Sequence, residues 1–221
     1  MNPYYTDDLV TIYNADCRDV LPSIDPATVD LLLTDPPYGS NYSAVGASGW
    51  AKASRTAKRR VEGDDRPFDP SHLLPYGRCV LWGANYFAHL LPPGGWIVWD
   101  KTGAGQARSF LGDGELAWSN IGTSVHVYHY LWLGMLRGGE KGTHGLHPTQ
   151  KPVALMRWIV DRWTEPGDLV LDPYMGSGPI AQACHELGRR YVGIEVEEDY
   201  CAIAVQRLGQ ESLMNWLASD A

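Results

Sequence analysis

The hydrophobic residues of this chain form two kinds of pattern. Short, uninterrupted apolar runs bounded by Pro, Gly or Asp are typical of buried strands, whereas apolar residues that recur every three or four positions are typical of amphipathic helices. The two patterns predict strands at 9–13, 29–34, 78–82, 96–99, 125–133, 168–171 and 190–196, and helices at 85–91, 152–163, 180–187 and 199–208.

Strands and helices alternate most clearly in the last third of the chain. This order implies an α/β fold with a doubly wound, mostly parallel sheet. We expect a single domain over residues 1–221, because this length suits one sizeable core. Within it we expect a mobile basic loop at 40–66, which is rich in Gly, Ser and Ala at its start, and an insertion at 102–146.

The overall charge of −8 argues against a nucleic-acid partner, because phosphates are bound by Lys and Arg. The distribution of charge changes this conclusion. Five basic residues lie close together with no acidic residue among them, namely Lys52, Arg55, Lys58, Arg59 and Arg60. A locally basic loop on an acidic body can hold a polyanion, although a solvated loop without a partner would have the same composition.

The composition also bears on compartment and metal binding. No apolar stretch is long enough to span a bilayer, and the first residues lack the pattern of a signal peptide, so we expect a cytoplasmic protein without a membrane partner. The four cysteines are scattered, and two pairs of histidines have no Cys or acidic cluster beside them. We therefore expect neither disulfides nor a metal site.

The segment Asp172–Gly178, which reads Asp-Pro-Tyr-Met-Gly-Ser-Gly, lies between a predicted strand and a predicted helix. Its glycines allow a ligand to approach the backbone closely, and the start of the helix offers free N–H groups. Glu195 ends the next predicted strand, where a carboxylate can bind both hydroxyls of a ribose. This pairing predicts a nucleoside-containing cofactor, and a dinucleotide is disfavoured because the full G-x-G-x-x-G is absent. A plain turn with a surface glutamate is the alternative.

The segment Asp35-Pro36-Pro37-Tyr38 follows the predicted strand 29–34, at the end where open α/β sheets place their active sites. The prolines fix the chain so that the Asp35 carboxylate and the Pro36 carbonyl face one substrate. Both groups are acceptors, which suits an amino group that donates two hydrogen bonds. Tyr38 offers a face on which a planar base can stack. Because Asp and Pro are common turn formers, a simple turn is the alternative.

Together these residues resemble a known family. Asp35-Pro36-Pro37-Tyr38 resembles the catalytic motif of the S-adenosylmethionine-dependent amino-methyltransferases, which modify adenine N6 or cytosine N4. The segment 147–152, His-Pro-Thr-Gln-Lys-Pro, resembles the one that packs beside the methionine end of the cofactor. Asp172–Gly178 resembles the cofactor loop, Glu195 the ribose-binding acid, and Asp16 the residue that contacts the cofactor's adenine. The catalytic motif precedes the cofactor loop, which resembles the permuted β group of DNA methyltransferases.

The resemblance implies a class I methyltransferase fold, S-adenosylmethionine as the cofactor and double-stranded DNA as the partner. It implies target recognition for the segment 102–146, and the basic cluster at 52–60 would then contact DNA. The catalytic residues that it implies are Asp35, Pro36, Pro37 and Tyr38. The cofactor-binding residues that it implies are Asp16, Asp35, His147, Thr149, Gln150, Lys151, Asp172, Tyr174, Gly176, Ser177, Gly178 and Glu195.

The expected reaction is site-specific methylation of adenine N6, by base flipping and direct in-line transfer. Adenine is favoured because cytosine N4 enzymes of this type more often carry Ser at the position of Asp35. Cytosine N4 methylation and a non-catalytic DNA-binding protein that retains the fold are the alternatives. The family suggests a homodimer and a link to restriction–modification. The chain departs from the family at Pro179, where Thr is commoner, and at Tyr174, where Phe is commoner.

Overall fold

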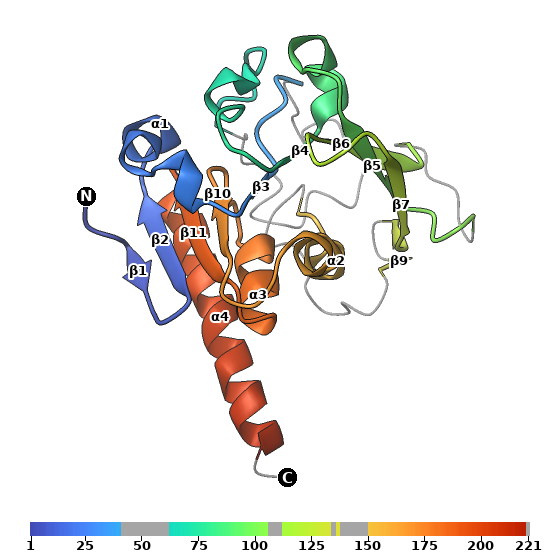
Figure 1. Cartoon of the computed structure of the whole chain (residues 1–221). Coiled ribbons are helices and arrows are strands. Elements are labelled where there is room, and N and C mark those ends of the chain that lie inside the picture. The colour runs from blue at the N-terminus through green and yellow to red at the C-terminus, as the bar shows by residue number, and fades with distance from the viewer. Residues whose placement is uncertain (41–61, 106–111, 134–135, 138–149, 220–221) are drawn as a thin grey trace.

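The computed structural model describes residues 1–40, 62–105, 112–133, 136–137 and 150–219. Within these ranges a nine-stranded sheet in the order β1-β2-β11-β10-β3-β4-β6-β5-β7 forms the centre of the molecule (Figure 1). Its strands are β1 (Tyr5–Thr6), β2 (Val10–Asn14), β3 (Leu31–Thr34), β4 (Cys79–Trp82), β5 (Gly95–Asp100), β6 (Gly114–Ser119), β7 (Val125–His129), β10 (Leu169–Asp172) and β11 (Arg190–Glu195).

The centre of the sheet is parallel and its two margins are mixed. Strands β2, β11, β10, β3 and β4 all run in the same direction. At one margin β1 pairs antiparallel with β2, and at the other β6 runs antiparallel to both β4 and β5, while β7 runs parallel to β5. The carboxyl ends of the five central strands therefore meet at one edge of the sheet, where ligands bind in folds of this kind.

Helices α2 (Val153–Trp163), α3 (Pro179–Glu186) and α4 (Glu198–Ser219) form one layer, in which α3 contacts both α2 and α4 (Figure 1). Leu31 and Leu33 of β3 face a core shared with these helices. Leu32 faces a second core on the opposite side, which includes residues of the short helix α1 (Cys17–Val20). The continuous apolar run of β3 reflects this burial on both faces.

Most predicted elements are confirmed within two residues of their bounds, but the predicted helix 85–91 is wrong. Two 3-10 turns, Ala84–Tyr86 and Ala88–Leu90, occupy its place. The first turn starts after Gly83, whose φ of 68° is left-handed, and Leu91 is extended, as a residue before proline prefers to be. The helix predicted at 199–208 is present but continues to Ser219.

The middle of the chain differs most from expectation. The predicted strand 125–133 ends at His129, and its alternating burial confirms a half-exposed strand. Trp132–Leu133 instead forms β8, which pairs with β9 (Leu136–Arg137) in a separate ribbon. Strands β6 and β7 lie within 102–146 and belong to the main sheet, and the insertion expected there stays a prediction. Its part in target recognition stays a prediction.

Three of the tryptophans, Trp82, Trp99 and Trp118, are buried in the cores.

The part of the chain that the structure describes contains no helix with both the length and the apolar character needed to cross a bilayer.

Candidate active site

The carboxyl edge of the parallel strands gathers acidic residues from distant parts of the chain. Asp35 follows β3, Asp172 ends β10, Glu195 ends β11 and Asp16 lies two residues after β2. Because these strands are neighbours in the sheet, all four residues lie along one edge. Two cavities adjoin there and have Pro37, Tyr174 and Glu195 in common in their linings.

The first cavity, of about 690 Å³, brings together most of the residues expected from the two motifs. A volume of this order suits a small-molecule ligand. The expected residues that line it are Asp35, Pro36, Pro37, Tyr38, Gln150, Lys151, Asp172, Tyr174, Gly176, Ser177 and Glu195. Asp16 lines the second cavity, of about 710 Å³, together with Tyr174 and Glu195.

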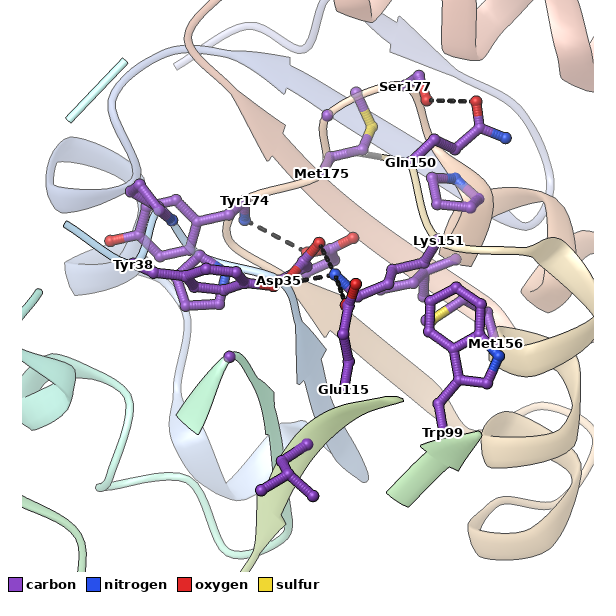
Figure 2. Close-up of a pocket in the computed structure, with 18 of the residues that line it drawn as sticks. Asp35, Tyr38, Trp99, Glu115, Gln150, Lys151, Met156, Tyr174, Met175 and Ser177 are labelled. Carbon is purple, nitrogen blue, oxygen red and sulfur yellow. Dashed lines mark hydrogen bonds and ion pairs between the residues drawn. The ribbon is translucent and has the colours of Figure 1, made fainter. Parts of the chain in front are cut away.

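Asp35 lies in a chain of polar contacts that crosses the first cavity (Figure 2). Its Oδ2 accepts a hydrogen bond from Lys151 Nζ at 2.6 Å, and its Oδ1 accepts one from the Tyr38 hydroxyl. Lys151 Nζ also donates to the Tyr38 hydroxyl oxygen at 2.9 Å and lies 3.0 Å from Glu115 Oε2. The other carboxylate oxygen of Glu115 forms an ion pair with Lys101. Glu115 and Lys101 were not predicted to be site residues, because they belong to no recognisable motif.

Burial and charge oppose each other in this group. Burial raises the pKa of Asp35 above its ordinary value, although the Lys151 ammonium acts in the other direction. Burial disfavours the charge on Lys151, yet the Asp35 and Glu115 carboxylates raise its pKa well above the ordinary value. Lys151 is therefore a permanent cation next to Asp35, in a side chain that is only 4% exposed.

A second carboxylate, Asp64, holds the backbone at the end of the Asp35–Tyr38 segment and just after it. Its Oδ1 accepts hydrogen bonds from the backbone N–H groups of Tyr38, Gly39 and Ser40 at 2.9 to 3.1 Å, and its Oδ2 accepts one from the Ser40 hydroxyl. Asp64 is buried. Sequence analysis assigned Asp64 to the loop 40–66 and gave it no role, because nothing in the sequence pairs it with Tyr38.

The ring of Tyr38 has a closely fitted position. It stacks on Tyr86, with 5.1 Å between ring centroids and 11° between the planes. On β4's side, Gly83 comes so near that a Cβ at this position would overlap the Tyr38 ring. Tyr38 is thus fixed by its hydroxyl on Asp35, by its backbone on Asp64 and by the absence of a side chain at Gly83.

The loop 172–178 has the shape expected of a ligand-binding loop. Gly176 and Gly178 both have positive φ, and the Gly176 N–H donates to Glu195 Oε2 at 2.8 Å. Gln150 lies nearby, where its Oε1 accepts from the Ser177 hydroxyl at 3.5 Å. The Nε2 of Gln150 is buried and has no hydrogen-bond partner among the described residues. Gln150 is one of the residues that line this cavity, and its unpaired amide donor fits a ligand with an acceptor such as the carboxylate of S-adenosylmethionine.

Asp16 is held in place by its own helix. It caps α1 by accepting from the Arg18 backbone N–H at 2.9 Å, and the Arg18 guanidinium contacts the same carboxylate. Hydrogen bonding to Arg18 lowers the pKa of Asp16 to about 2. Asp16 therefore lies in the second cavity as a carboxylate at neutral pH.

Asp172 is fully buried and joins β10 to its neighbours. It accepts hydrogen bonds from the Thr34 hydroxyl at 2.6 Å and from the Tyr191 hydroxyl at 3.0 Å. Burial outweighs these bonds and raises the pKa of Asp172 from 3.8 to about 7. The folded chain therefore holds a proton at Asp172 that the unfolded chain releases between these two pH values.

We expect the free energy of unfolding to depend less on pH when Asp172 is replaced by Asn. The stability that the raised pKa contributes is fully present below about pH 4 and is lost as the pH rises through about 7. The free energy of unfolding of the unsubstituted chain, relative to that of Asp172→Asn, should therefore fall by about 2–4 kcal/mol between pH 4 and pH 7.5. Urea unfolding of both chains at several pH values measures this difference, and a difference independent of pH would contradict the assignment.

Several expected site residues lie outside the described residues. His147 and Thr149 fall in 138–149, and the basic cluster Lys52, Arg55, Lys58, Arg59 and Arg60 falls in 41–61.

Comparisons with known proteins identify relatives of this chain. The sequence profile of the DNA methylase family matches residues 123–206. The predicted methylase YubD of Escherichia coli (strain K12) is 41% identical over 215 residues, which cover 93% of each chain. The type II methyltransferase M2.DpnII of Streptococcus pneumoniae is 28% identical over 96% of this chain and 94% of its own.

Solved structures share the fold. The M1.HpyAVI–SAM complex superimposes with a TM-score of 0.58 and 24% identity, over 90% of this chain and 100% of the other. The PvuII DNA methyltransferase, which is cytosine-N4-specific, gives a TM-score of 0.62 and 16% identity, over 93% and 88% of the two chains. At these identities the likeness shows the class I methyltransferase fold alone.

The identity to the Escherichia coli relative over nearly the whole length, the family profile and the fold lead to one assignment. The chain belongs to the N6-adenine and N4-cytosine family of DNA amino-methyltransferases, and it is a DNA methyltransferase whose cofactor is S-adenosylmethionine.

Proposed function

We propose that the chain methylates the N6 amino group of adenine in double-stranded DNA, and that Asp35 orients this group. The observation that carries the proposal is the position of the Asp35 carboxylate, which lines the same cavity as Gln150 and the loop 172–178. An acid at position 35 favours adenine, because cytosine N4 enzymes that resemble this chain more often carry Ser there. The proposed substrate is consistent with the cytoplasmic location expected from the sequence.

The proposed catalytic residues act on the amino nitrogen. Adenine N6 is a weak nucleophile because its lone pair is delocalised into the ring. Asp35 and the Pro36 carbonyl each accept one N–H, which favours a pyramidal nitrogen with a localised lone pair. The same oxygens stabilise the positive charge that develops on the nitrogen during direct, in-line transfer. S-adenosylmethionine would supply the methyl group from its sulfonium sulfur, which leaves as a neutral thioether, and the methylated nitrogen then releases one proton to become neutral.

Two neighbours of Asp35 must adapt when the base enters. The Tyr38 hydroxyl and Lys151 both contact the Asp35 carboxylate, so an incoming amino group competes with them for its lone pairs. Pro36 and Pro37 limit the freedom of the backbone, which keeps the carboxylate directed into the cavity. Tyr38, which lines the cavity and stacks on Tyr86, would provide an aromatic side chain beside the base.

We further propose that the cofactor spans both cavities. Gln150, Ser177 and Gly176, which line the first cavity, would hold the methionine end together with the neighbouring Gly178. The Nε2 of Gln150 has no hydrogen-bond partner among the described residues, so it has a bond to offer. Glu195 lines both cavities and would bind the ribose hydroxyls. Asp16, in the second cavity, would accept a hydrogen bond from the adenine amino group. Asp172 and Tyr174 support the loop, and His147 and Thr149 keep their expected roles through the resemblance alone.

The DNA must present its base outside the duplex. In a duplex the amino group is paired and stacked, so the target adenine would be flipped into the first cavity. The basic cluster Lys52, Arg55, Lys58, Arg59 and Arg60 would bind phosphates beside the site. The homodimer suggested by the resemblance also belongs to the proposal, and sedimentation analysis of the purified chain tests it.

Replacing Arg59 and Arg60 together with Ala is expected to weaken DNA binding and to reduce its salt dependence. Each lost phosphate contact lowers the slope of log K against log salt concentration by about 0.9. The double variant should therefore have a slope that is smaller by about two. Arg190→Ala is the matched control, because Arg190 is the first residue of β11 and lies at the end of this strand away from the site. An unchanged slope in the double variant would exclude these residues from the interface.

The reaction is tested by methyl transfer from labelled S-adenosylmethionine to unmethylated DNA, followed by separation of the nucleosides. N6-methyladenine supports the proposal. If N4-methylcytosine were found, the target base would be cytosine in place of adenine, and the cofactor assignment would be unchanged. Cofactor binding without transfer to any DNA would contradict the proposed substrate.

A further inference from the structure

Glu115 and Lys101 lie in the middle of the chain, outside the motifs that define the site. Glu115 is on β6 and Lys101 directly follows β5. The two strands pair so that Trp99 is opposite Glu115 and Asp100 is opposite Gly114. A Cβ at Gly114 would lie 2.8 Å from the Trp99 carbonyl oxygen, so a glycine is needed immediately before Glu115 for β6 to lie this close to β5. This pairing brings both charged side chains to the cavity that contains Asp35.

Lys151 poses an electrostatic problem for the proposed reaction. Its ammonium lies 2.6 Å from the carboxylate that has to stabilise positive charge on the amino nitrogen. A cation at this distance opposes the formation of a second cation close by, and the opposition is strong because Lys151 is screened from water. A pair formed by Asp35 and Lys151 alone would have no net charge.

Glu115 changes this balance. Its Oε2 lies 3.0 Å from the same Lys151 Nζ, so that the ammonium contacts two carboxylates (Figure 2). The three groups together carry one net negative charge. Lys101 is paired with the far oxygen of Glu115 and touches neither Asp35 nor Lys151 in any described hydrogen bond or ion pair.

We propose that Glu115 is a positioning residue for methyl transfer: by holding Lys151 and offsetting its charge, it keeps the Asp35 site net negative toward the reacting nitrogen. This inference rests on the proposed role of Asp35 as the acceptor of the target amino group. Glu115 acts through Lys151 and does not itself contact the base. Lys101, through its ion pair with Glu115, offsets part of the negative charge that Glu115 contributes.

The charged groups around Asp35 give the proposal a distinctive pH dependence. Tyr38 faces Asp35 from the same loop, Lys151 from the segment before α2, Glu115 from β6 and Asp172 from β10. The negative charge of Glu115 raises the pKa of Asp35, so removing that charge should lower it. Because Asp35 acts as a carboxylate, the rate should fall as the pH drops through its pKa.

The test compares Glu115→Gln with Lys101→Met in single-turnover methyl transfer, measured against pH with saturating S-adenosylmethionine and DNA. Glutamine keeps the volume of Glu115 and an oxygen that can lie beside the Lys151 ammonium, so a purely structural role would survive the change. We expect Glu115→Gln to lower the rate constant at pH 8 by about ten- to thirtyfold. It should also move the acid limb of the profile to lower pH by about one unit, while the KM for S-adenosylmethionine changes less than about threefold.

Lys101→Met should shift the acid limb of the pH profile in the direction opposite to Glu115→Gln. Without Lys101, the charge of Glu115 is less compensated, so the acid limb should move to higher pH. If Glu115→Gln does not fold, the shift in Lys101→Met still tests the proposal. The proposal would be overturned if the acid limbs of both variants moved in the same direction. It would also be overturned if Glu115→Gln kept a rate within twofold of the original and its acid limb did not move.

Asp35→Asn, measured in the same assay, separates the two proposals. An inactive Asp35→Asn beside an unaffected Glu115→Gln refutes the role of Glu115 alone. An active Asp35→Asn refutes the proposed function on which that role depends.

Discussion

Replacing Asp35 by Asn should lower single-turnover methyl transfer by at least about a hundredfold while S-adenosylmethionine binding is retained. Asparagine has nearly the same shape, but it presents one acceptor oxygen and one NH₂ group in place of two acceptor oxygens. It carries no charge, so it cannot offset the positive charge that develops on the amino nitrogen. It also leaves Lys151 facing Glu115 alone, which makes the local charge around the nitrogen less favourable.

The Asp35 measurement needs a rate of chemistry and a binding constant. Rapid quenching with enzyme in excess over DNA gives the first, and equilibrium titration with S-adenosylmethionine gives the second. Asp8→Asn is the matched control, because Asp8 is exposed in the turn between β1 and β2. Transfer by Asp35→Asn within tenfold of the original rate would remove Asp35 from the catalytic role.

Gly83→Ala is expected to reduce methyl transfer by about a hundredfold through displacement of Tyr38. A Cβ at position 83 would overlap the Tyr38 ring, and the φ of 68° is unfavourable for any residue with a Cβ. The ring must move, and the contact of its hydroxyl with Asp35 and its stacking on Tyr86 are then lost. The DNA-dependent rate should fall much more than S-adenosylmethionine affinity, because the substitution acts on Tyr38 and the described backbone hydrogen bonds of Gly83 go to Leu116 and Tyr86.

Gly77→Ala is the control for Gly83→Ala, since a Cβ at Gly77 would meet no atom within 4 Å and Gly77 does not have a left-handed φ. Melting temperatures of both variants show whether the chain still folds. If Gly83→Ala is folded and transfers methyl groups at the original rate, the position of Tyr38 is not important for the reaction.

The most accurate predictions from the sequence concern the acidic residues at the ends of the parallel strands. Asp35, Asp172 and Glu195 were predicted to be at the ends of buried strands, and parallel strands that are neighbours in a sheet bring such ends together without further information. Continuous apolar runs, as in β3, also predicted burial on both faces. These features depend on local composition and on one general rule of topology.

The antiparallel margin was not predictable in the same way. Glu115 reaches the site only because β6 inserts between β4 and β5, against the order of the chain, and its sequence contains no signal for that pairing. Asp64 is a similar case, because its hydrogen bonds to Tyr38, Gly39 and Ser40 depend on how the chain returns after residue 61. The helix predicted at 85–91 failed because proline and glycine at its ends outweighed its apolar spacing.

Adenine N6 methylation that depends on Asp35 can be measured directly by nucleoside analysis of DNA from a methylation-free host that expresses either the original chain or Asp35→Asn. We predict N6-methyladenine at one recurring short sequence with the original chain and none with Asp35→Asn at equal expression. N4-methylcytosine in place of N6-methyladenine, or N6-methyladenine that persists with Asp35→Asn, would contradict the account.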